Sequence, residues 1–307
     1  MSNARGYRRG GSRGQSGILT TIITVIVFAL IIIAVLNMLG VFKTDGDTTT
    51  APMPAGSARV HFIDVGQADC ILIENGTGAV MIDAGKQEDA PKIENYLAEH
   101  GIKRLDYIIG THAHNDHMGG MDEIIEYFSI GEMIAPTKPS ESRFYVGVLD
   151  AAKKRGVPVR TAAKGEKLNA AGGTFEFIDD GSDTLSDMNN SSYVIKFTYG
   201  ETSFLFVGDA EADYEREIML SGADIDADVL KVGHHGSGGS SSDRFISSVS
   251  PELAVIQVGI DNDYGHPSKQ ALDRFLEHGV EVYRTDEVGD VIITTDGKEL
   301  SVETTEE

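Results

Sequence analysis

A cluster of histidines constrains this chain more than any other feature. Residues 111–120 read THAHNDHMGG, and they follow an apolar, strand-like run at 105–109. Residues 121–128 then show the spacing of apolar residues that is typical of a helix. A strand-to-helix turn can direct several side chains into one cleft, and imidazole with carboxylate suits zinc, manganese or iron. The sequence therefore predicts a metal site whose ligands include His112, His114, Asp116 and His117.

These four side chains fall into two pairs. His112 and His114 are two residues apart on an extended segment, so they can point to the same side. Asp116 and His117 lie where the helix begins, and there they can reach a second ion. We therefore expect two neighbouring ions, each with its own part of the cluster.

The pattern His-x-His-x-Asp-His after a strand resembles the signature of the metallo-β-lactamase fold hydrolases. Five other motifs narrow the resemblance to the hydrolase domain at the end of the ComEC competence proteins and its stand-alone relatives. In chain order they are VHFIDVGQ at 60–67, MIDAG at 81–85, FVGD at 206–209, KVGHHGS at 231–237 and YGHP at 264–267. The resemblance covers roughly residues 58 to 300. It implies an α/β (α+β) fold, the four-layer αββα sandwich.

The resemblance also implies further ligands. Asp209 ends a strand-like run and matches the carboxylate that bridges two ions, although an aspartate there can also cap a helix. One of His234 and His235 should complete the second ion with Asp116, His117 and Asp209. We favour His235 as that ligand, and His234 is the alternative.

The chain departs from the broad superfamily where many members place a third histidine for the first ion. It has no histidine between His117 and His234, and residues 187–192 read DMNNSS instead. We therefore expect a weaker or more open first site, with two zinc ions as the first choice and manganese as the alternative. Asn190 or Ser191 would contact the substrate or a metal-bound water, unless they only form a turn that opens the next strand.

The resemblance implies a metal-bridging hydroxide that attacks a phosphodiester, in DNA or in a decorated envelope polymer. The alternatives are a lactonase or β-lactamase-like hydrolase, and a non-catalytic metal-binding module in envelope function or DNA uptake. The predicted catalytic residues are Asp116, His234 and His266. The predicted substrate-binding residues are Asn190, Ser191, Ser237 and Tyr264.

The N-terminal region predicts a membrane anchor. Residues 1–17 contain four arginines and no acidic residue, and residues 18–42 contain no charged residue. A helix of that length crosses a hydrocarbon core of about 30 Å, and the arginines keep the N-terminus in the cytoplasm. A cleavable secretory signal is the alternative. We expect a flexible linker at 43–57 and an extracytoplasmic hydrolase domain at 58–303.

Composition limits the partners of that domain. The chain has a formal net charge of −22, and such acidity counts against tight, non-specific binding of DNA. It does not exclude phosphodiester chemistry, because a pair of divalent cations inverts the local field. The single cysteine, Cys70, lies in an apolar run and predicts a buried core thiol rather than a ligand.

Four local predictions concern the surroundings of the site. Asp64 or Asp83 either supports a ligand histidine or caps a turn. The serine- and glycine-rich stretch at 236–242 predicts a mobile or anion-binding loop. We expect Tyr145 at the surface and Ser268 as the cap of a helix.

Overall fold

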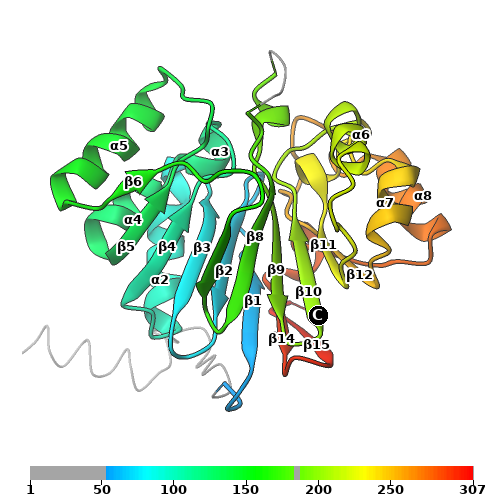
Figure 1. Cartoon of the computed structure of the whole chain (residues 1–307), viewed down its shortest axis with the longest axis horizontal. Helices are drawn as coiled ribbons and strands as arrows, with labels where there is room; N and C mark the ends of the chain where they lie inside the picture. Colours follow the sequence, from blue (N-terminus) through cyan, green and yellow to red (C-terminus); the bar gives the residue numbers. More distant parts are fainter. Residues whose placement is uncertain (1–52, 183–186, 307) are drawn as a thin grey trace, which may run out of the picture. The chain divides into compact units, whose positions relative to one another are not determined.

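The computed structural model describes residues 53–182 and 187–306, which form two stacked β-sheets with helices on both outer faces (Figure 1). The first sheet has the strand order β15-β14-β1-β2-β3-β4-β5-β6, and the second has the order β13-β12-β11-β10-β9-β8-β7. This two-sheet sandwich confirms the predicted α/β architecture of the hydrolase domain.

Strands of the first sheet come from both ends of the described region. They are β1 (Ala58–Phe62), β2 (Cys70–Glu74), β3 (Ala79–Ala84), β4 (Arg104–Ile109), β5 (Ser129–Ile134), β6 (Val159–Arg160), β14 (Val291–Thr295) and β15 (Leu300–Thr304). The neighbours β3, β4, β5 and β6 run parallel, whereas β1, β2, β14 and β15 are joined by antiparallel pairs.

Strands of the second sheet follow one another along the chain. They are β7 (Lys167–Ala170), β8 (Gly173–Asp179), β9 (Val194–Tyr199), β10 (Thr202–Phe206), β11 (Val229–Lys231), β12 (Leu253–Ile256) and β13 (Glu281–Arg284). From β10 to β13 the pairs are parallel, so the carboxyl ends of these strands share one edge of the sheet.

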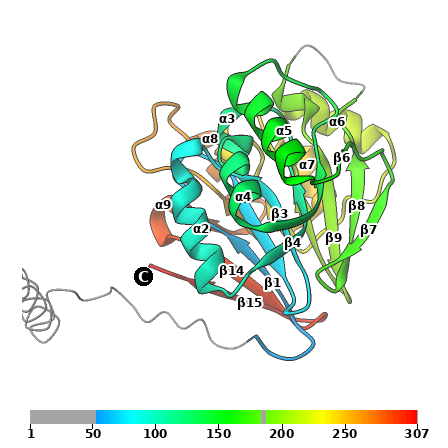
Figure 2. The same cartoon turned by 90° about the vertical axis from the view of Figure 1, so that its left-hand side faces the viewer.

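Helices cover the two outer faces, as Figures 1 and 2 show. Over the first sheet lie α2 (Ala90–Glu99), α4 (Met121–Tyr127) and α5 (Arg143–Arg155). Over the second lie α6 (Ala212–Leu220), α7 (Asp243–Val249) and α8 (Lys269–Glu277). The short helical segments are η1 (Gln87–Asp89), α3 (Asn115–Met118), η2 (Asn189–Ser191), η3 (Gly233–Gly236) and α9 (Thr285–Val288).

Alternation along the strands builds three apolar layers. On β3, Val80 and Ile82 face the core between the sheets, whereas Met81 packs under the helices of the first sheet. On β10, Phe204 and Phe206 face the core between the sheets, and Leu205 packs under α6 and α7. Successive side chains of a strand point to opposite faces, so a strand covered on both sides must be apolar throughout.

Several predictions can be compared with these elements. Ser268 caps α8, because its Oγ accepts a hydrogen bond from Ala271 N, and Cys70 is fully buried, so both predictions are confirmed. The prediction for Tyr145 was wrong, since this ring is 4% exposed and packs between α5 and the first sheet. In the described part of the chain, no helix is long and apolar enough to cross a membrane. The predicted anchor at 18–42 lies outside the described residues.

Candidate metal centre

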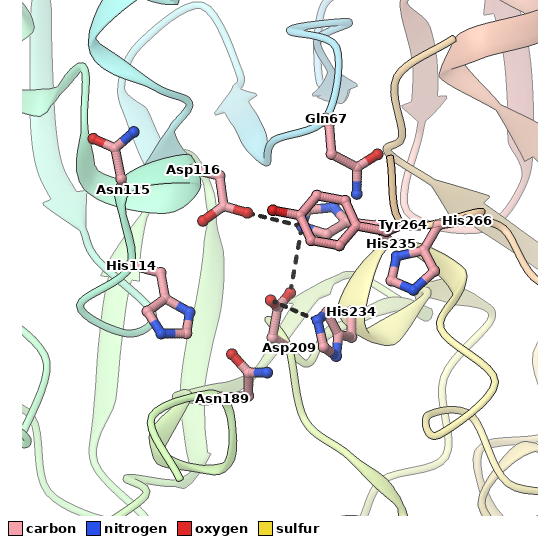
Figure 3. A pocket seen from close by; sticks show the side chains of 10 residues that line it. All are labelled: Gln67, His114, Asn115, Asp116, Asn189, Asp209, His234, His235, Tyr264 and His266. Atoms are coloured by element: carbon pink, nitrogen blue, oxygen red, sulfur yellow. Dashed lines mark ion pairs between the residues drawn. The ribbon is translucent and has the colours of Figure 1, made fainter. Parts of the chain in front are cut away.

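The predicted ligands come together at one edge of the sandwich. The histidine cluster follows β4, Asp209 follows β10, and the His234–His235 pair follows β11. The carboxyl ends of neighbouring parallel strands meet at one edge, and open α/β sheets bind ligands there. Figure 3 shows side chains from these separate segments converging around Asp209.

Four groups form a compact site for the second ion. Asp209 Oδ1 lies 3.3 Å from His117 Nε2 and 3.8 Å from His235 Nε2, and Asp116 Oδ2 lies 3.4 Å from His235 Nε2. His117, Asp209 and His235 are buried, whereas the side chain of Asp116 is 30% exposed. These spacings allow one ion to contact all four groups.

The hydrogen-bonding pattern indicates that this site is built for a cation. His117 Nε2, His235 Nε2 and Asp209 Oδ1 are buried atoms without a hydrogen-bond partner, although they lie side by side. Unpaired polar atoms are costly in a protein interior, and a metal ion satisfies all of them at once. The donor set of two imidazoles and two carboxylates fits a divalent transition metal.

The opposite ring nitrogens of the two histidines are already engaged. His117 Nδ1 lies 2.8 Å from Asp83 Oδ2, and His235 Nδ1 lies 2.9 Å from Gln257 O. Donation from Nδ1 fixes the tautomer in which Nε2 is free to bind an ion. Of the two aspartates proposed for support, Asp83 therefore contacts His117, which is a predicted ligand. Asp64 instead accepts a hydrogen bond from Gly66 N in a turn.

Strained backbone conformations surround the ligands. Asp83, His234 and His235 have φ values of 56°, 48° and 51°, in the left-handed region that non-glycine residues rarely adopt. Such conformations persist only where the surrounding structure enforces them, and they cluster at functional sites.

The electrostatics of this group favour protonated histidines and ionised aspartates. Burial opposes the charged form of His117, but Asp209 and Asp83 outweigh it and raise the pKa of His117 well above its ordinary value. Burial likewise opposes the imidazolium of His235, and Asp209 and Asp69 raise its pKa to about 10. Burial would raise the pKa of Asp209, but His117 and His235 hold it well below its usual range.

His112 and His114 form the second pair of predicted ligands. His112 Nε2 lies 3.0 Å from His114 Nδ1 and 3.8 Å from Asp209 Oδ2. Burial, followed by the nearby His117, lowers the pKa of His112 well below its ordinary value, so this imidazole is neutral and able to bind a metal. Its Nδ1 lies 3.2 Å from Ser192 Oγ, a residue of the segment where other members would place a third histidine.

His234 differs from its neighbour. Its Nδ1 lies 3.2 Å from Glu211 Oε1, its Nε2 lies 3.8 Å from Asp209 Oδ2, and its side chain is 23% exposed. Both residues line the same cavity, but His235 is buried and points at Asp116, whereas His234 is partly exposed. The geometry therefore favours His235 as the ligand and leaves His234 available to a bound substrate.

The cavity above the ligands measures about 310 Å³. Its wall contains several predicted site residues and three further residues, Gln67, Asn115 and Asn189. The predicted residues in the wall are His114, Asp116, Asp209, His234, His235, Tyr264 and His266. The Tyr264 and His266 rings stack at a centroid distance of 5.8 Å (Figure 3).

Three predicted substrate contacts do not line this cavity. Asn190 is 5% exposed, and its Oδ1 accepts a hydrogen bond from Glu211 N. Ser191 is buried and donates to Met188 O, and Ser237 Oγ accepts from Gly239 N. These groups are used within the protein, so Asn189 takes the place at the cavity that was expected for Asn190 or Ser191.

The loop at 236–242 is anchored, so the mobile alternative was wrong, and anion binding by this loop stays a prediction. Arg274 Nη1 donates to Ser240 O at 2.8 Å, and Nη2 donates to Gly238 O at 3.0 Å. The buried carboxylate of Glu215 accepts hydrogen bonds from Ser241 N and Ser242 N. Side chains of α6 and α8 thus fix the segment that follows the histidine pair.

Comparison with known proteins agrees with this geometry. The family model of the metallo-beta-lactamase superfamily matches residues 63–259. The chain belongs to this superfamily. It is accordingly a metal-dependent hydrolase, with a cluster of histidines and aspartates suited to metal ions.

Curated relatives place the chain near the competence proteins. It is 32% identical to ComE operon protein 3 of Bacillus subtilis, over 78% of this chain and 33% of that protein. It is 30% identical to Competence protein ComA of Neisseria gonorrhoeae, over 76% of this chain and 32% of that protein. The chain therefore spans about a third of the length of the curated relatives it matches.

Solved structures support the fold. The metallo-beta-lactamase fold protein YhfI from Bacillus subtilis superposes with a TM-score of 0.54 at 13% identity, over 78% of this chain and 99% of that one. Igni18, a metallo hydrolase from Ignicoccus hospitalis, gives a TM-score of 0.51 at 14% identity, over 78% of this chain and 98% of that one.

Proposed function

We propose that this protein is a phosphodiesterase or nuclease that works with two divalent metal ions. The observation that carries the proposal is the convergence of buried, unpartnered atoms of His117, Asp209 and His235 beside Asp116. When bound, two such ions would stabilise negative charge and lower the pKa of water toward about 7. Zinc is the first choice for the ions, and manganese is the alternative.

The two ions would bind with unequal strength. Asp116, His117, Asp209 and His235 would hold the tight ion in a buried, prearranged site. His112 and His114 would hold the other ion together with Asp209, without a third histidine. This ion would have three protein ligands where the tight ion has four, so its site would be weaker and would leave positions open to the substrate.

Residues of the cavity would then handle the substrate. Glu211 would orient His234, and His234 would donate a proton to the leaving oxygen. His266 lies at a ring distance of 5.5 Å from His234 and would share this task. Tyr264, which is 72% exposed, would contact the part of the substrate outside the metal centre.

The relatives favour a phosphodiester substrate. One of them is named Competence protein ComA and another Recombination protein 2, from Haemophilus influenzae, and both names refer to processes that handle DNA. DNA is therefore the first substrate to test, and a decorated envelope polymer is the second. A lactone is the alternative substrate class.

We also propose that residues 18–42 anchor the chain in the cell membrane with its N-terminus in the cytoplasm. The four arginines before this segment and the link to competence proteins support this orientation. Reporter enzymes that work only outside or only inside the cytoplasm, fused after residue 57, test it. Activity of the cytoplasmic reporter would overturn the proposed orientation.

Hydrolysis assays with matched variants test the proposed chemistry. The full chain with zinc or manganese should cleave bis-p-nitrophenyl phosphate and DNA faster than a lactone. His234→Gln should keep both ions and lose rate, whereas His235→Gln should also lose the tight ion. Hydrolysis of the lactone alone, or no phosphodiester turnover with either metal, would refute the proposal.

A further inference from the structure

A buried lysine lies directly behind the candidate metal centre. Lys231 is the last residue of β11, and its side chain has no exposed surface. Its Nζ lies 2.8 Å from Asp69 Oδ2 and donates to Val232 O at 3.0 Å. An unpaired ammonium is very costly in a protein interior, so the contact with Asp69 is what makes this position tolerable.

Asp69 links the lysine to the ligand histidines. Its Oδ1 lies 3.3 Å from His235 Nδ1, and its Oδ2 lies 3.9 Å from His117 Nδ1. The carboxylate is 1% exposed, and it approaches the ring nitrogens that face away from the ion. Asp69 therefore acts on the two histidines from the side opposite to the metal.

The position of Asp69 would also suit a cation. Ligand atoms of Asp69 group within 4.8 Å with those of Asp83 and His117, and also with those of Asp209 and His235. Lys231 already supplies a positive charge to one oxygen of Asp69. The ammonium thus already pairs with an oxygen of Asp69 that a further metal ion would need.

A count of formal charges gives the lysine a second effect. The buried or half-buried aspartates at 69, 83, 116 and 209 contribute four negative charges, and Lys231 cancels one of them. Two divalent ions would then leave the centre with one net positive charge, whereas without Lys231 they would only neutralise it. A positive centre attracts an anionic substrate within a chain of net charge −22.

We propose that Lys231 is a built-in counter-ion of the metal centre and that it positions His235 through Asp69. The ammonium holds the Asp69 carboxylate against His235 Nδ1, beside the hydrogen bond to Gln257 O. This support keeps His235 Nε2 directed at the tight ion. The proposal rests on the proposed role of His235 as a metal ligand.

A double-mutant cycle on the full chain tests this coupling. Lys231→Met, Asp69→Asn and the double variant are compared for the dissociation constant of the tight ion, by chelator competition, and for the visible spectrum with cobalt(II). Loss of an outer partner of a metal ligand costs about 10- to 100-fold in affinity. We expect each single variant to lose affinity for the tight ion within this range and to show an altered cobalt spectrum. The double variant should bind the ion no more weakly than the single variant with the lower affinity.

Lys196→Met is the matched control. Lys196 lies on β9, and its Nζ pairs with Asp224 Oδ2 at 2.8 Å. Lys196 does not line the cavity, so its replacement should leave ion affinity and the cobalt spectrum unchanged. If Lys231→Met is less stable but keeps the wild-type ion affinity and spectrum, Lys231 has only a structural role and the proposal is overturned. Additive effects of the two substitutions on ion affinity would overturn it as well. If Lys231→Met does not fold, an unaltered cobalt spectrum in Asp69→Asn overturns it. None of these measurements uses turnover. An inactive protein that shows the expected coupling would therefore refute the proposed phosphodiesterase activity and leave the role of Lys231 intact.

Discussion

Binding of the tight ion should depend steeply on pH. The Nδ1 atoms of His117 and His235 face Asp83 and Gln257 O, and their Nε2 atoms face Asp209. Because the pKa of His117 is raised and that of His235 is raised to about 10, both rings carry a proton on Nε2 at neutral pH. An ion must displace both protons, so raising the pH favours binding.

The size of this effect follows from the proton count. Displacing two protons changes the dissociation constant about 100-fold per pH unit. This equals about 2.7 kcal/mol of binding free energy per pH unit, since each proton contributes roughly 1.4 kcal/mol. Chelator competition at several values between about pH 6 and pH 8 measures the slope. A pH-independent constant would refute the assignment of both histidines.

Three further perturbations have defined outcomes. Asp83→Asn removes the acceptor of His117 Nδ1, so we expect the tight ion to bind about 10- to 100-fold more weakly by chelator competition, and unchanged affinity would contradict this role. Tyr193→Phe removes a hydroxyl that donates to Ala135 O and accepts from Ala162 N, so the free energy of unfolding in urea should fall by about 1–3 kcal/mol. An unchanged urea midpoint would count against that bridge. Arg274→Met frees the carbonyls of the 236–242 loop, so hydrogen exchange at 238–241 should accelerate, and wild-type exchange rates would show that Glu215 alone anchors it.

The short-range pattern of the sequence predicted much of the centre. Four predicted ligands fall within six positions at a strand-to-helix turn, namely His112, His114, Asp116 and His117. The resemblance to a known family added Asp209 and the His234–His235 pair. The structure brings these residues to one edge of the sandwich. Local spacing carried this information because a metal site needs several donor side chains of suitable chemistry within a few ångströms.

The supporting residues could not be read from the sequence in the same way. Asp69 lies two positions after the motif at 60–67, and Lys231 begins the motif that contains the histidine pair, yet neither residue is unusual in isolation. Their roles depend on the contact between Asp69 and Lys231, which lie 162 positions apart in the sequence. This contact forms only because β2 packs against the second sheet. Asn190 and Ser191 illustrate the converse, since polar residues next to a site can be fully used by backbone groups.

The anchored loop at 236–242 shows a further limit of composition. Glycine and serine are typical of flexible segments, but here Glu215 and Arg274 bind the loop backbone from two helices. These partners lie more than 20 positions away on either side. Flexibility is therefore decided by the hydrogen bonds a segment receives and not by its own residues alone.

The number and affinity of bound ions test the central claim most directly. Titration of the ion-free full chain with zinc or manganese, followed by chelator competition, should give one tight and one weaker ion per chain. His235→Gln should abolish the tight class, and His114→Gln should affect only the weaker one. A single class of site, or loss of the tight ion in His114→Gln but not in His235→Gln, would contradict the arrangement described here.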